Sequence, residues 1–210
     1  MDLQLQGRTA LVTGASQGIG RAVARILARE RVKLAVVARR RPLLEALSGE
    51  IVAAGGIPPA LVEADLYPEG ASEDVAARAL SALGRVDILI NAAGGSRPIT
   101  FDASKEQWHE GMILNFWRLR ELTHAIVPSM KANQFGRIVN FTGTSEPKIL
   151  NAAFSAKAAV HVWAKGLSRE VAPHNITINS LQPGRIRSEQ IDKRYPTEDR
   201  KSTRLNSSHT

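Results

Sequence analysis

The chain of 210 residues has no cysteine and no uninterrupted apolar run of membrane-spanning length. Without cysteine, disulfide bonds and thiolate metal sites are excluded, and a reducing compartment fits the composition. No apolar run of about 18 residues is present, and the N-terminus lacks a basic segment leading into one. We therefore expect a cytoplasmic protein with no metal site and no membrane contact.

The chain also lacks a basic run of the kind that binds nucleic acid. The net charge is +8, but the basic residues are spread over helix-like segments without interleaved aromatic residues. This pattern is typical of a solvated surface rather than of a nucleic-acid interface. The one dense basic cluster is Arg39-Arg40-Arg41.

Six short apolar runs alternate with longer amphipathic segments. The runs predict buried parallel strands at 8–13, 33–38, 60–63, 87–91, 137–141 and 176–181. The segments between them predict helices at 18–29, 42–54, 72–83, 104–131 and 151–171, with Gly55-Gly56, Gly84 and Gly136 as stops. Strict alternation predicts an α/β fold: a doubly wound, Rossmann-type, mostly parallel sheet with helices on both faces.

The glycine-rich run TGASQGIG lies directly between the first predicted strand and the first predicted helix. Gly14, Gly18 and Gly20 remove three Cβ atoms from this turn, so backbone N–H groups and a helix N-terminus can approach a pyrophosphate. A glycine-rich turn alone is weak evidence, but its place in a βαβ unit predicts a dinucleotide site.

Polar and glycine-rich groups follow the other strands, where ligands of doubly wound sheets bind. They are Asp65, Asn91-Ala92-Ala93-Gly94, Thr142-Gly143-Thr144 and Pro183-Gly184-Arg185-Ile186.

These motifs, together with Asn115 within a predicted helix and GRIVN at 136–140, resemble the short-chain dehydrogenase/reductase family from Gly7 to about Ser188. The resemblance implies an NAD(P)-dependent oxidoreductase. It implies that the cofactor is bound by the residues Gly14, Ser16, Gln17, Gly18, Ile19, Gly20, Asp65, Leu66, Asn91, Ala92, Ala93, Gly94, Lys157, Pro183, Gly184, Ile186 and Ser188.

Charge at the end of the second strand predicts NADP in preference to NAD. A carboxylate there would bind a ribose diol and repel a 2′-phosphate. This chain instead has Ala38 followed by Arg39 and Arg40, and guanidinium groups pair well with phosphate. The alternative is that these arginines only begin a solvated helix.

The catalytic residues implied by the resemblance are Asn115, Thr144 and Lys157. The family's reaction uses a tyrosine four residues before the lysine, and here that position is Ala153. Counting from GRIVN places the family's serine at Gly143, so Thr144 could supply the hydroxyl; alternatively, Thr144 only satisfies a turn. Tyr195, in the segment 188–196, is the one candidate for a substitute phenol.

The last twelve residues, 199–210, are polar and without periodicity. They predict a disordered, non-native tail, and residues 199–209 can be encoded by a common sequencing-library adapter. We therefore expect a single NAD(P)-binding domain over 1–198 with an incomplete C-terminus, so that the last strand of the family's sheet is missing.

Two functions remain open from the sequence. The first is an NADP(H)-dependent oxidoreductase that transfers hydride to or from a small carbonyl or alcohol substrate, such as a 3-oxoacyl thioester. The second is a non-catalytic NADP(H)-binding sensor or partner subunit that has lost the tyrosine. The resemblance further implies a homodimer or homotetramer that pairs through the helices carrying Asn115 and Lys157.

Overall fold

The computed structural model describes residues 3–144 and 146–184. All strand pairs in its six-stranded sheet are parallel, and the order is β3-β2-β1-β4-β5-β6. This confirms the predicted doubly wound α/β fold. The strands are β1 (Thr9–Thr13), β2 (Lys33–Ala38), β3 (Ala60–Glu63), β4 (Ile88–Asn91), β5 (Gly136–Phe141) and β6 (Ile176–Leu181).

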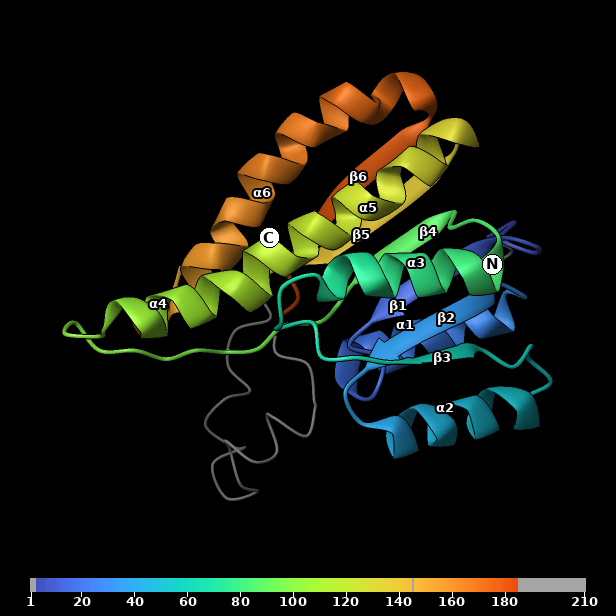
Figure 1. The fold of residues 1–210 in the computed structure, drawn as a ribbon, viewed down its shortest axis with the longest axis horizontal. Helices are drawn as coiled ribbons and strands as arrows, with labels where there is room; N and C mark the ends of the chain where they lie inside the picture. The colour runs from blue at the N-terminus through green and yellow to red at the C-terminus, as the bar shows by residue number, and fades with distance from the viewer. Residues whose placement is uncertain (1–2, 145, 185–210) are drawn as a thin grey trace, which may run out of the picture.

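Helices cover both faces of the sheet (Figure 1). They are α1 (Gly18–Arg29), α2 (Arg41–Ala53), α3 (Ala71–Leu83), α4 (Lys105–Met112), α5 (Arg118–Ala132) and α6 (Ala152–Val171). The predicted helical segment over 104–131 is interrupted by a π-helical turn, Ile113–Trp117, which contains Asn115 and separates α4 from α5. In Figure 1 these three segments form one long rod, and α6 runs alongside it.

Alternating side chains of the strands build a core on each face of the sheet. On one face, Leu11, Val37 and Leu89 pack with the buried residues of α3 and α5. On the other, Val12 and Val36 pack with the buried residues of α1 and α2. The strands are apolar on both faces because both faces are covered, which is why they appear in the sequence as continuous apolar runs.

Glycines end two of the helices as predicted, but not the third. Gly55 and Gly84 have φ of +77°, the left-handed conformation typical of a residue after a helix. Gly136 is instead the first residue of β5, and the chain turns at Gln134, whose φ is +52°. A Cβ at Gly136 would lie 2.5 Å from the Met130 sulfur, so close packing accounts for this glycine.

The order of the strands reverses between β1 and β4, so the loops after these two strands separate to opposite sides. Thr13, at the end of β1, holds the loops together at their origin. Its hydroxyl donates to the Ile90 carbonyl and accepts from the N–H groups of Ala92 and Ala93, at 3.1–3.2 Å. This switch point is where doubly wound sheets bind ligands.

No described helix combines the length and the apolar composition that a membrane span requires. Within residues 3–144 and 146–184, no cluster of three or more histidine, aspartate and glutamate side chains is arranged to hold a metal ion.

Candidate active site

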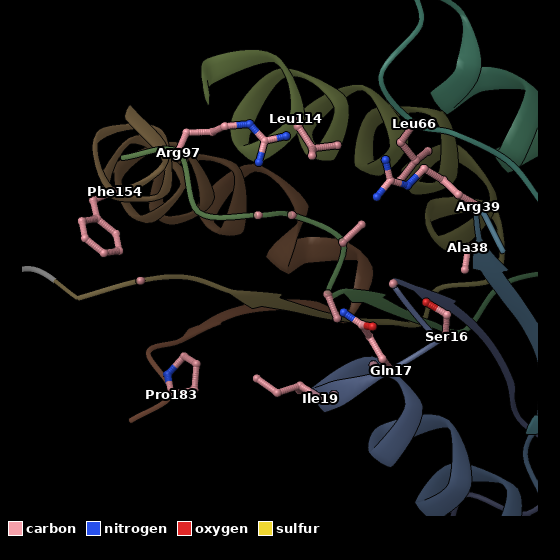
Figure 2. A pocket seen from close by; sticks show the side chains of 18 of the residues that line it. Ser16, Gln17, Ile19, Ala38, Arg39, Leu66, Arg97, Leu114, Phe154 and Pro183 are labelled. Atoms are coloured by element: carbon pink, nitrogen blue, oxygen red, sulfur yellow. The ribbon is translucent and has the colours of Figure 1, made fainter. Parts of the chain in front are cut away.

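A cleft of about 1620 Å³ lies along the carboxyl ends of the strands. Figure 2 shows Ser16, Ala38 and Arg39 at one end, and Arg97, Phe154 and Pro183 at the other. The cleft collects residues from every strand end. Of the predicted cofactor and catalytic residues, its lining includes Gly14, Ser16, Gln17, Gly18, Ile19, Gly20, Arg39, Arg40, Asp65, Leu66, Ala92, Ala93, Gly94, Thr144, Pro183 and Gly184.

The glycine-rich turn forms the floor of the cleft at the switch point. Gly14 has a φ of +66°, and a Cβ there would lie 2.7 Å from the Ala92 carbonyl oxygen. A Cβ at Gly20 would lie 2.5 Å from the Gly14 carbonyl oxygen. Helix α1 begins at Gly18, so its unpaired N–H groups and the positive end of its dipole face the cleft. This arrangement suits a phosphate group.

Cationic groups line the end of the cleft next to β2. The Arg39 side chain is exposed and, within the described part of the chain, forms no ion pair or hydrogen bond. Arg40 donates to the Gln17 side-chain oxygen at 2.5 Å, so it braces the glycine-rich turn. Asp65 lies after β3 and accepts from the Tyr67 N–H at 3.0 Å.

Asn91 does not line the cleft, because its side chain points into the interior. Its amide donates to the Asn140 oxygen at 2.9 Å and to the Thr123 hydroxyl at 3.1 Å. These bonds tie β4 to β5 and α5. The buried Asn91 side chain therefore positions the neighbouring residues Ala92 and Ala93, which line the cleft.

Asn115 occupies the π-helical turn and is 1% exposed. Its amide group donates to the carbonyls of Gly95 and Gly111, and its oxygen accepts from the Gly95 N–H at 3.1 Å. A π-helical turn changes the direction of side chains, and such turns are frequent at functional sites. Here it lets one buried amide hold the loop that follows β4.

Lys157 lies behind the cleft lining, next to two of its glycines. Its Nζ donates to the Phe141 carbonyl at 2.8 Å, and a Cβ at Gly94 would lie 3.3 Å from the same Nζ. Burial lowers the pKa of the Lys157 ammonium from 10.5 to about 8. Within the described residues Lys157 has no ion-pair partner.

Ala153 and Phe154 occupy the helical turn before Lys157. Ala153 is 1% exposed, and its N–H donates to the Asn151 side chain that caps α6. Phe154 lines the cleft, and its Cδ1 lies 3.1 Å from where a Cβ at Gly143 would stand. An aromatic ring without a hydroxyl therefore stands beside Lys157.

The two threonines after β5 differ in their contacts. The Thr142 hydroxyl donates to the Leu181 carbonyl at 3.0 Å and is 5% exposed. Thr144 lines the cleft, and its hydroxyl oxygen accepts from the Glu146 N–H at 3.1 Å. Within the described residues, no group accepts a hydrogen bond from the Thr144 hydroxyl, so this donor can serve a ligand.

Several residues of the cleft were not predicted. Arg97 lies in the loop after β4 and pairs with Glu110 of α4 at 2.7 Å. The Asn151 side chain accepts from the Arg97 N–H at 3.0 Å and donates to the Ser96 hydroxyl at 2.8 Å. The i, i+3 spacing of Phe154 and Lys157 places both on one helix face and could have indicated Phe154. No comparable sequence pattern indicates the Arg97–Glu110 pair.

Ile186, Ser188 and Tyr195 lie outside the described residues, as does the tail 199–210. Their predicted roles stay predictions.

The sequence matches the family model of short chain dehydrogenases over residues 8–199, so the chain belongs to this family of NAD(P)-binding oxidoreductases. A short chain dehydrogenase of Pseudocercospora fijiensis is 35% identical over 194 residues. The aligned region covers 89% of this chain and 62% of that relative. The chain therefore spans less than two thirds of the length of this relative.

Solved structures share the fold. L-sorbose reductase from Gluconobacter frateurii, complexed with NADPH and L-sorbose, has a TM-score of 0.88 at 28% identity, over 92% of this chain and 75% of that one. A 7α-hydroxysteroid dehydrogenase complexed with NADH and 7-oxo glycochenodeoxycholic acid has a TM-score of 0.88 at 29% identity, over 94% and 78%. Structures that contain either cofactor are thus equally similar to this chain.

Proposed function

We propose that the protein is an NADP(H)-dependent oxidoreductase that interconverts a small carbonyl substrate and its alcohol. The observation that carries the proposal is one continuous cleft with the N-terminus of α1 on its floor and Arg39 at its end. Arg39 pairs with no other described residue. The helix N-terminus offers N–H donors for a pyrophosphate, and Arg39 offers a guanidinium for a 2′-phosphate. No carboxylate follows β2 directly to oppose that phosphate.

Residues along the cleft bind and position the cofactor and the substrate. When bound, the cofactor supplies or accepts the hydride. Asp65 and Leu66 border the adenine end, Thr144 offers a hydroxyl to a substrate oxygen, and Asn115 holds the loop that carries Gly94. Pro183 and Gly184 close the opposite wall, next to the nicotinamide end.

The test is a titration with NADPH followed by turnover. The purified chain should quench or shift NADPH fluorescence on binding, and it should oxidise NADPH in the presence of some member of a panel of 3-oxoacyl thioesters and small ketones. Tight NADPH binding without turnover of any carbonyl favours the second candidate, a cofactor-binding sensor or partner subunit. Ala153, which has no ionisable group at the family's tyrosine position, is the observation that favours that candidate.

Arg39→Asp should weaken NADPH far more than NADH. A charge-assisted hydrogen bond to phosphate contributes about 1.5–3 kcal/mol, so NADPH affinity should fall about 10- to 100-fold while NADH affinity changes less than threefold. Isothermal titration with both cofactors measures the difference. Arg29→Asp, on the exposed last turn of α1, is the charge-matched control. Equal losses for the two cofactors would contradict the assignment of Arg39.

We further infer a cytoplasmic homodimer or homotetramer that acts on a small molecule and binds neither nucleic acid nor membrane. Apolar side chains are exposed beside α5 and α6, with Val162 78% and Trp117 42% accessible. Exposed apolar side chains on packed helices suit a subunit contact. Sedimentation should give at least twice the chain mass of 22.8 kDa, and Val162→Glu should shift the protein toward the monomer.

A further inference from the structure

We propose that Lys157 itself donates the proton to the substrate oxygen during carbonyl reduction, in place of a tyrosine. This inference rests on the proposed oxidoreductase function and names the acid that the function needs. It assigns to the ammonium group a direct contact with the substrate rather than an action through a neighbouring phenol.

The ammonium of Lys157 lies close to the wall of the cleft. Lys157 Nζ lies directly behind Gly94, and its Cδ lies 3.5 Å from where a Cβ at Gly143 would stand. Gly94, in the loop after β4, and Gly143, after β5, both line the cleft, as does Phe154. Neither position has a side chain, so the ammonium lies close behind the backbone of the cleft wall, next to the Asn115 amide and the Phe154 ring. In the proposed step, a substrate oxygen reaches the ammonium between these two groups.

The Lys157 ammonium has hydrogen-bond donors left for a substrate. An ammonium has three N–H donors, and one of them is directed to the Phe141 carbonyl. That bond fixes the position of Nζ at the end of β5 and leaves two donors. A buried cation without a counterion gains most from an oxygen that becomes negatively charged, which is what a carbonyl oxygen does as hydride reaches its carbon.

The surrounding charges do not stabilise the protonated form of Lys157. Arg97 and Glu110 pair with each other at 2.7 Å, and neither forms an ion pair with Lys157. Other charged or titratable groups on the elements around it are Glu146 and Lys148 after β5, Lys105, Glu106 and His109 on α4, and His161, Lys165, Arg169 and Glu170 on α6. Burial, and not a neighbouring charge, therefore lowers the pKa of the ammonium, to about 8, where it can exchange protons near neutral pH.

The other described cleft residues are less suited than Lys157 to donate the proton. Lys148 also lines the cleft, but its side chain is exposed. Glu110 is paired with Arg97, and Glu146 is exposed. Tyr67 lies with Asp65 at the adenine end of the cleft. The Thr144 hydroxyl can orient a substrate oxygen, but a hydroxyl is a poor acid.

The step balances without a further reactant. Hydride from the reduced nicotinamide forms the new C–H bond at the carbonyl carbon, and the carbonyl π electrons take a proton from the Lys157 ammonium to form the O–H bond. The ketone is reduced to an alcohol, the nicotinamide is oxidised, and Lys157 becomes a neutral amine. Water returns the proton, and oxidation of the alcohol runs through the same positions in reverse.

The pH dependence of turnover tests the assignment. In the wild type, the rate of reduction should be constant below pH 8 and fall tenfold per pH unit above it. Lys157→Arg keeps the charge but cannot release its proton, so kcat should fall about 10²- to 10⁴-fold and the break near pH 8 should disappear. Its Kd for NADPH should change much less. Lys165→Arg, on an exposed turn of the same helix, should keep the wild-type profile.

A second measurement does not depend on activity. Lysines methylated with ¹³C-formaldehyde give an NMR signal for each site, and the Lys157 signal, assigned by its loss in Lys157→Arg, should titrate near pH 8. Two results would overturn the role of Lys157 without affecting the proposed function. One is an NMR titration midpoint near pH 10, and the other is a pH–rate break near pH 8 that persists in an active Lys157→Arg. A wild type that binds NADPH but reduces no carbonyl would instead overturn the proposed function, and this inference with it.

Discussion

Gly20→Ala should disable the nucleotide end of the cleft and destabilise the fold. The added Cβ would lie 2.5 Å from the Gly14 carbonyl oxygen, 2.8 Å from the Gly14 carbonyl carbon and 2.9 Å from the Thr13 oxygen. These atoms are backbone, so no side chain can rotate away, and the glycine-rich turn must move as a unit. Overpacking of this kind costs about 1–3 kcal/mol of unfolding free energy.

Cofactor binding should suffer together with stability. The turn that would move carries the N–H groups at the start of α1, and a displaced donor loses its hydrogen bond to a phosphate oxygen. We expect NADPH affinity to fall about 10- to 100-fold, which corresponds to about 1.4–2.8 kcal/mol. Titration calorimetry and urea unfolding measure the two effects.

Gly49→Ala is the matched control for this prediction. Gly49 lies within α2, and a Cβ there would meet nothing within 4 Å. Alanine in a helix interior is favoured over glycine by about 1 kcal/mol, so this variant should be more stable than the wild type and bind NADPH equally well. Wild-type affinity in Gly20→Ala would show that the turn does not form the cofactor site.

The strands could be predicted because both faces of the sheet are covered. Continuous apolar runs such as 33–38 follow directly from that burial, and β2 begins and ends at the predicted residues. The glycine-rich turn was predictable because its glycines are required by backbone contacts that lie close in sequence or at the neighbouring strand end. Patterns of this kind can be recognised in the sequence without knowledge of the fold.

The end of the cleft near Arg97 and Phe154, which we propose binds the substrate, depends on contacts between distant segments. It could not be predicted in the same way. The Arg97–Glu110 pair and the bonds from Asn151 to the loop after β4 join residues 13 to 55 positions apart. The π-helical form of the turn cannot be recognised from its sequence, ILNFW, which is compatible with an ordinary helix. Hydrogen bonds from Asn115 to Gly95 accompany the altered geometry, and no periodicity in the sequence indicates them.

Lys157→Met should raise the stability of the protein at pH 7 and lower it above pH 10. The pKa of Lys157 is about 8 in the folded protein and 10.5 in an ordinary environment, so the unfolded chain binds more protons between these values. Stability therefore rises with pH across this window, and below pH 8 the buried ammonium costs about 3 kcal/mol. Methionine keeps an unbranched stem and removes the charge.

The substitution also removes a hydrogen bond. The cost of losing this bond determines the size and the sign of the net change in unfolding free energy at each pH. Loss of the 2.8 Å bond leaves the Phe141 carbonyl without this donor, at a cost of about 1–2 kcal/mol. We expect a net gain of about 1–2 kcal/mol at pH 7 and a net loss of similar size near pH 10.5, where the wild-type amine is neutral. Urea unfolding at both pH values measures the reversal.

Lys165→Met, at an exposed position of the same helix, is the control and should change stability by less than about 0.5 kcal/mol at either pH. A Lys157→Met variant with the same stability difference at pH 7 and pH 10.5 would show that the ammonium is not desolvated. If the reversal is observed, the fold carries a buried charge that methionine would replace with a gain in stability at neutral pH. A charge that weakens the fold beside Gly94 and Gly143 is what the proposed proton donation by Lys157 requires.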